Sequence, residues 1–114
     1  MNGNQYYHKH IDKVIDKYNE LIQLVTQSSL KPTVVSYENI LAGFDFLIGR
    51  EPEGWGWVGN WNRRELQRLR LGIVKENGFR SEQHKGEVID SLELLRAKYE
   101  DVGGGLMPTD PFDQ

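Results

Sequence analysis

REPEGWGWVGNWNRRELQRLRLGIVKENG, residues 50–78, joins a loop-forming half of the sequence directly to a helix-forming half. The first half, up to Asn60, contains three glycines and Pro52, which favour a loop over a helix or a central strand. The apolar residues of the second half recur at helical spacing, at Leu66, Leu69 and Ile73. We therefore expect a crossover loop followed by a helix over residues 62–77.

Both ends of this helix carry residues typical of helix boundaries. Asn62 is followed three residues later by Glu65, the spacing of a capping box with asparagine in the usual Ser/Thr place. We expect Asn62 to cap the first turn. The Asn77–Gly78 pair is expected to end the last turn.

Before the loop, a second helix is expected over residues 37–48. Ser36 stands where an N-cap belongs, and Gly49 stands where a C-terminal cap belongs. Gly43 costs about 1 kcal/mol of helix propensity relative to alanine, which a close crossing of another helix would explain. Phe46 lies off the apolar face of this helix. That face carries Tyr37, Ile40, Leu41, Phe44, Leu47 and Ile48.

A long first helix is expected over residues 5–27, ended by Ser28–Ser29 and Pro32. Its apolar stripe is about 120° wide at 100° per residue. The stripe consists of Tyr7, Ile11, Val14, Ile15, Tyr18, Leu21, Ile22 and Val25. So wide a stripe must be covered by at least two other elements or by a second copy of the chain.

After the third helix, Ser81 is expected to cap a fourth helix over residues 82–101. Its apolar seam is spaced like a helix-packing surface, at Val88, Leu92, Leu95 and Tyr99. His84 lies one turn before this seam and is expected to be a half-buried histidine with a partner. Because the first and fourth helices both carry long seams, we expect them to pair roughly antiparallel.

These patterns predict an all-α fold, a small four-helix bundle over residues 1–102 with a Gly/Trp-rich loop between the second and third helices. Residues 103–114 are expected to form a flexible C-terminal tail, because they begin with three glycines and include two prolines. The tail is either a frayed end or a short docking motif anchored by Phe112.

Composition limits the classes of function. Of 114 residues, 38% are hydrophobic and 27% charged, and there is no cysteine. No apolar run approaches the roughly 20 residues of a membrane span, and the first residues lack the apolar core of a signal peptide. We therefore expect a cytoplasmic protein without membrane association. The net charge of -3 gives no general attraction to nucleic acid, so such binding would need a local basic patch.

The sequence contains no signature of catalysis, metal binding or cofactor binding. On a helix, His8 and His10 would point roughly 160° apart and could not share a metal ion. The glycines of GWGWVG lack the preceding strand and following lysine of a phosphate-binding loop. We therefore expect neither an enzyme nor a cofactor.

Two groups of residues are candidates for binding. The tryptophans Trp55, Trp57 and Trp61 either fold back as a lid on the core or form an exposed platform. On the predicted third helix, a basic row spans about 60° nearly opposite the buried face, with Arg63, Arg70 and Val74 on a flank. The row comprises Arg64, Arg68, Leu71 and Lys75.

These residues favour a small interaction protein, such as an adaptor, a regulator or a stoichiometric inhibitor. Arginine and tryptophan are enriched among interface hot spots, and a basic row suits an acidic protein surface. The partner is another protein or a second copy of the chain in a homodimer. The alternative is a nucleic-acid or phosphate-ligand binder that uses the same row. In a third interpretation the tryptophans are core, and the arginines are neutralised by Glu87, Asp90 or Glu93.

Overall fold

The computed structural model describes the backbone of residues 3–50 and 57–104 and the side chains of residues 12–50 and 62–98. Within these ranges the chain is all-α, as predicted. Its helices are α1 (Gly3–Gln27), α2 (Val34–Arg50), α3 (Trp57–Glu76) and α4 (Glu82–Gly104). None of the described helices is long and apolar enough to cross a membrane.

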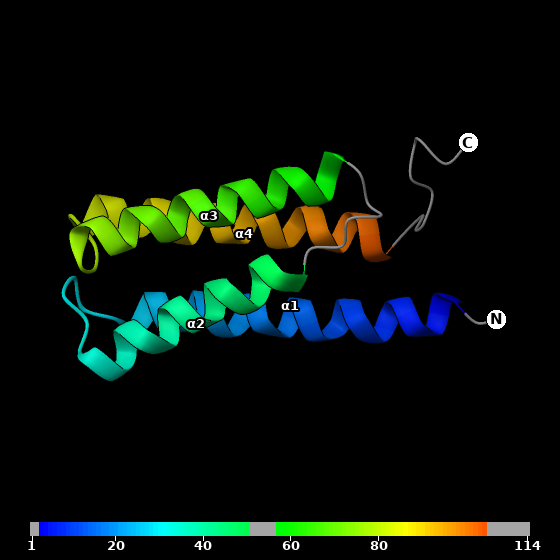
Figure 1. Ribbon diagram of the computed structural model, residues 1–114, viewed down its shortest axis with the longest axis horizontal. Helices are drawn as coiled ribbons and strands as arrows, with labels where there is room; N and C mark the ends of the chain where they lie inside the picture. The colour runs from blue at the N-terminus through cyan, green and yellow to red at the C-terminus, as the bar shows by residue number, and fades with distance from the viewer. Residues whose placement is uncertain (1–2, 51–56, 105–114) are drawn as a thin grey trace.

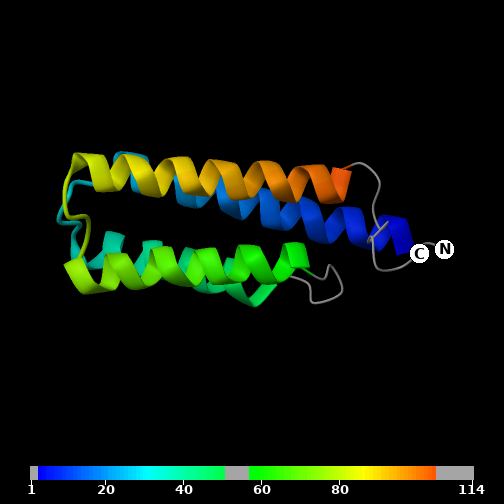
Figure 2. The same cartoon turned by 90° about the horizontal axis from the view of Figure 1, so that it is seen from above.

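The four helices form a bundle in which neighbours in the chain run in opposite directions (Figure 1). α1 packs against α2 and α4, and α2 packs against α3. Figure 2, seen from above, shows α1 beside α4 along one side of the bundle and α2 beside α3 along the other. The predicted antiparallel pairing of the first and fourth helices is therefore confirmed.

The core is built from the apolar seams of all four helices, as their periodicity predicts. In α1 the described part of the stripe is covered by α2 and α4 within one chain. Phe79, in the connection between α3 and α4, also lies in the core. The buried apolar side chains are Val14, Tyr18, Leu21, Val25, Ile40, Phe44, Leu47, Leu66, Leu69, Ile73, Phe79, Val88, Leu92 and Leu95.

At one end of the bundle the α1–α2 connection is hydrogen-bonded to the α3–α4 connection. The Phe79 amide donates to the Leu30 carbonyl at 2.8 Å. Gly78, with a φ of 140°, permits this approach, because a Cβ there would lie 2.4 Å from the Leu30 oxygen. Lys31 Nζ donates to the Glu76 carbonyl at 2.6 Å, and Lys85 Nζ donates to the Ser28 carbonyl at 2.6 Å. Side chains therefore also link the two halves of the chain, the first containing α1 and α2 and the second containing α3 and α4.

α3 ends where the sequence predicts, with a Schellman motif. Asn77 is left-handed, with a φ of 57°, and its amide donates to the Val74 carbonyl at 3.2 Å. The Gly78 amide donates to the Ile73 carbonyl at 3.0 Å. These bonds satisfy carbonyls that the end of a helix would otherwise leave unpaired. The predicted cap at Ser81 is also confirmed, because its hydroxyl accepts a hydrogen bond from the His84 amide at 3.1 Å.

The predicted caps of α2 are wrong at both ends. The N-cap is Thr33 instead of Ser36, because the Thr33 hydroxyl accepts from the Ser36 amide at 3.1 Å and its carbonyl accepts from the Tyr37 amide at 2.8 Å. At the other end the helix continues through Gly49 to Arg50. The explanation predicted for Gly43 is confirmed, because a Cβ there would lie 3.0 Å from Leu21 Cδ1.

The boundaries of α3 and α4 also differ from the prediction. α3 begins at Trp57, five residues before the predicted start, so the glycine-rich half of residues 50–78 is partly helical. α4 continues to Gly104, three residues past its predicted end. Residues 51–56 of the predicted loop and 105–114 of the predicted tail lie outside the described residues.

Asn62 does not cap α3; it lies within the helix and is fully buried. It shares the core-facing side of the helix with Leu66, Leu69 and Ile73 by spacing. Neither the oxygen nor the nitrogen of its side chain has a hydrogen-bond partner among the described residues. A buried amide without partners destabilises a fold, because it loses its bonds to water without replacement.

We expect Gly78→Ala to lower the free energy of unfolding by about 2–4 kcal/mol, because the methyl group would collide with the Leu30 carbonyl and the φ of 140° suits glycine. Urea denaturation followed by circular dichroism measures this change. Gly86→Ala is the control, because a Cβ there meets nothing within 4 Å. Equal stability of the two variants would show that the close approach is not needed.

We expect Asn62→Leu to raise the free energy of unfolding by about 1–2 kcal/mol, because it replaces an unpartnered buried amide by an apolar group of similar shape. Asn62→Asp should do the opposite, since it buries a charge. Thermal and urea unfolding of the two variants checks both signs. A large loss of stability in Asn62→Leu would mean that the amide is bonded in the folded protein.

Candidate partner-binding face of α3

The outer side of α3 carries the predicted basic row, which we call the basic face and define as Arg64, Arg68, Leu71 and Lys75. All four side chains are exposed, as predicted from their position opposite the core-facing leucines. The exposed fraction is 55% for Leu71, which lies between the cations, and 38% for Val74, which lies on the flank of the face. The face therefore presents apolar area between cations.

Within the basic face, Arg68 forms an ion pair with another residue of α3. Arg68 Nε donates to Glu65 at 3.0 Å, and a second bond joins Nη2 to the same carboxylate. This hydrogen bonding lowers the pKa of Glu65 and raises the pKa of Arg68. Arg64 and Lys75 have no ion-pair partner among the described residues. The cations without an ion pair among the described residues, Arg64 and Lys75, therefore lie at the two ends of the basic face.

The flanking arginines have a different environment from those of the basic face. Arg63 and Arg70 are both half-buried, in agreement with the predicted flank. Arg70 Nε forms an ion pair with Asp45 of α2 at 2.8 Å, which links the two helices. The predicted alternative, neutralisation by Glu87, Asp90 or Glu93, is wrong for Arg70, whose ion-pair partner is on α2. It holds in part for Arg68, which is ion-paired with Glu65 on α3 and is also attracted by the charge of Glu87 on α4.

Because α3 begins at Trp57, it includes two of the three candidate tryptophan positions. Positions 57, 61, 64 and 68 follow one another at spacings of four, three and four, so they share one side of a regular helix. The side chains of Trp57 and Trp61, and all of Trp55, lie outside the described residues.

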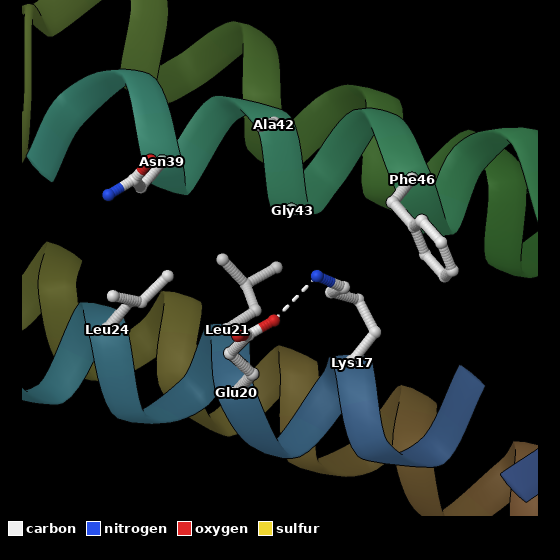
Figure 3. A pocket seen from close by; sticks show the side chains of 8 residues that line it. All are labelled: Lys17, Glu20, Leu21, Leu24, Asn39, Ala42, Gly43 and Phe46. Atoms are coloured by element: carbon white, nitrogen blue, oxygen red, sulfur yellow. Dashed lines mark hydrogen bonds and ion pairs between the residues drawn. The ribbon is translucent and has the colours of Figure 1, made fainter. Parts of the chain in front are cut away.

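A groove of about 430 Å³ runs between α1 and α2 (Figure 3). Phe46 stands at one end of it, with Lys17 Nζ 5.0 Å and the Arg50 guanidinium carbon 4.6 Å from the ring centroid. Lys17 also forms an ion pair with Glu20 at 2.6 Å. No apolar periodicity of the sequence predicts this groove. Its signal was the off-stripe Phe46 on a helix with small residues, and its lining is Lys17, Glu20, Leu21, Leu24, Asn39, Ala42, Gly43 and Phe46.

A smaller pocket of about 70 Å³ lies between α3 and α4, beside the basic face. His84 forms part of its wall. Its Nδ1 accepts from the Arg80 amide at 2.9 Å and its ring lies 5.9 Å from that of Phe79, so it is the half-buried, partnered histidine that was predicted. The lining residues are Arg68, Leu69, Gly72, His84, Glu87, Val88 and Ser91.

The described residues contain no group of three or more histidines, cysteines or carboxylates placed to hold a metal ion. His8 and His10 lie in α1, but their side chains are outside the described set. No family model matches the chain, and no curated protein or solved structure is significantly similar to it. Function must therefore be argued from the surfaces of the molecule.

We expect Glu65→Gln to lower the free energy of unfolding at neutral pH by only about 0.5 kcal/mol, because water screens this surface ion pair. The folded-state pKa of Glu65 lies below its ordinary value of 4.5, so the pair stabilises the fold above that pH. The difference from the unmodified chain should disappear as pH falls below 4.5 through the lowered pKa. Urea unfolding between pH 7 and pH 3 measures it, and a difference that grows on acidification would contradict the assignment.

Proposed function

We propose that this chain is a small non-catalytic interaction protein, an adaptor, regulator or stoichiometric inhibitor, that binds an acidic surface on another protein through the basic face of α3. The observation that carries the proposal is the exposure of Leu71 among Arg64, Arg68 and Lys75, with exposed Val74 on the flank of this row. Interface cores favour apolar and arginine side chains together, whereas a single exposed leucine needs no explanation.

The composition of the face favours a protein over a nucleic acid. Leu71 is more than half exposed in the middle of the cationic row, where a phosphate backbone would offer it no apolar contact. The net charge of -3 also opposes long-range attraction to a polyanion. An acidic protein surface with apolar side chains between its carboxylates satisfies both parts of the face.

The tryptophan positions extend the proposed surface. In the register of α3, positions 57 and 61 continue the line of Arg64 and Arg68 toward the start of the helix. We propose that Trp57 and Trp61, with Trp55 before them, supply anchors for the partner, since tryptophan is the residue type most enriched in hot spots. Arg63 on the flank would contribute at the rim.

Two alternatives use the same face. The three cations of the basic face also suit a nucleic acid or a phosphate-bearing ligand, because an arginine fork donates bidentate hydrogen bonds to phosphate. A second copy of the chain is an alternative protein partner, with the acidic residues of α4 as the complement. We propose a cytoplasmic location for each of these functions.

We expect Arg64→Glu to abolish capture of the partner in pull-downs from host lysate, because it places a repulsive charge on the contact. Leu71→Ser should weaken capture about 5- to 30-fold through lost apolar burial. Lys13→Glu, an exposed charge reversal on α1, is the matched control and should bind normally. If all three variants captured the same proteins as the unmodified chain, the basic face would not be the binding surface.

The same variants separate the alternatives. Fluorescence anisotropy with labelled DNA and RNA at low and moderate salt measures nucleic-acid binding, which should fall steeply with salt and depend on Arg64 but not on Leu71. Sedimentation velocity measures self-association. Salt-steep binding of nucleic acid would replace the proposal by its alternative, and a dimer broken by Arg64→Glu would make the second copy the partner.

A further inference from the structure

Three side chains that can donate hydrogen bonds line the pocket between α3 and α4. Its lining includes the side chains of Arg68, His84 and Ser91. Arg68 uses Nε and Nη2 for Glu65, and no hydrogen bond joins its Nη1, His84 Nε2 or Ser91 Oγ to another described residue. Three polar side chains, each with an atom that is not hydrogen-bonded to another described residue, therefore line one small pocket together with Glu87.

The tautomer of His84 is set by its own backbone. Because Nδ1 accepts a hydrogen bond from the Arg80 amide, the proton of the neutral ring is on Nε2. Nε2 is the nitrogen that faces Gly72 across the pocket. It offers a donor there and has no lone pair for a metal ion. The pocket therefore suits a ligand that accepts hydrogen bonds.

Gly72 has no packing reason to be glycine. A Cβ at this position would meet a single neighbouring atom within 4 Å, His84 Nε2 at 3.8 Å, which is an ordinary contact. Glycine inside a helix is less stable than alanine. The missing side chain leaves the His84 donor open to the pocket.

The size and charge of the pocket limit the ligand. A volume of about 70 Å³ holds a group of a few atoms, since a water molecule occupies roughly 30 Å³ in the liquid. Glu87 also lines the pocket; its carboxylate accepts from Gln83 at 3.4 Å and attracts the Arg68 guanidinium. This negative charge opposes a phosphate, whose charge at neutral pH exceeds one, more strongly than it opposes a single carboxylate. The first turn of α4, where His84 lies, favours an anion through the helix dipole.

We infer that the α3–α4 pocket binds one carboxylate group, which accepts hydrogen bonds from His84 Nε2, Ser91 Oγ and Arg68 Nη1. Arg68 belongs to both the pocket and the basic face, so an aspartate or glutamate side chain of a partner bound to that face would reach it. Assigning the carboxylate to a partner rests on the proposed function, whereas binding of a free carboxylate does not.

The test is a titration of the full chain with acetate at constant ionic strength and pH 7.5, followed by NMR of the backbone amides and the His84 ring. We expect saturable shifts at Gly72, His84 and Ser91 with a millimolar dissociation constant. Gly72→Ala should raise that constant at least about fivefold, because its methyl group covers Nε2. Gly86→Ala is the matched control with the same helix-propensity gain and should bind acetate normally.

The remaining outcomes decide against the inference. No saturable shift with acetate, or equal affinity in Gly72→Ala, would overturn it. Acetamide binding as tightly as acetate would show that charge is irrelevant, and tighter binding of inorganic phosphate would exclude a carboxylate pocket. Ser91→Ala supplies a second variant that weakens acetate binding without altering the α3 backbone. If the chain does not bind acetate, Arg64→Glu is still expected to abolish capture of the partner. The carboxylate pocket and the proposed function can therefore fail independently of each other.

Discussion

The contact on which the bundle depends is the hydrogen bond from the Phe79 amide to the Leu30 carbonyl. It joins the α1–α2 connection to the α3–α4 connection, so it ties one half of the chain to the other. Only glycine at position 78 lets the two backbones come this close. Phe79 then enters the core, and Ser81 starts α4 two residues later. The direction of α4 beside α1 is thus set within a few residues of one close approach.

Periodicity predicted the helices and the core because burial is a property of a whole helix face. The same logic did not predict the environments of several single residues. Phe79 carries no periodic signal, since the Leu30 contact is what directs it inward. Asn62 matched a capping box by spacing, but the helix had begun earlier and carried it into the core. Ser36 is the better cap by residue type, but the helix begins three residues earlier, so Thr33 is the residue placed to cap it.

For the candidate site, helical periodicity predicted which side chains are exposed but not which of them are ion-paired. The exposure of Arg64, Arg68, Leu71 and Lys75 follows from their angle to the core face, and the structure bears it out. Which arginines are paired did not follow, because Arg70 finds Asp45 on another helix. The groove at Phe46 and the pocket at Gly72 were also out of reach. Each is formed by two helices whose relative position no single-helix pattern contains.

The two lysine hydrogen bonds between the α1–α2 half and the α3–α4 half of the chain are sensitive to covalent modification of the lysines. Lys31 and Lys85 each give an ammonium hydrogen to a carbonyl at the end of a helix in the opposite half. Acetylation of these amines would remove the charge that favours the carbonyl end of a helix. Modification at two side chains would therefore loosen the join between the halves without altering a single core residue.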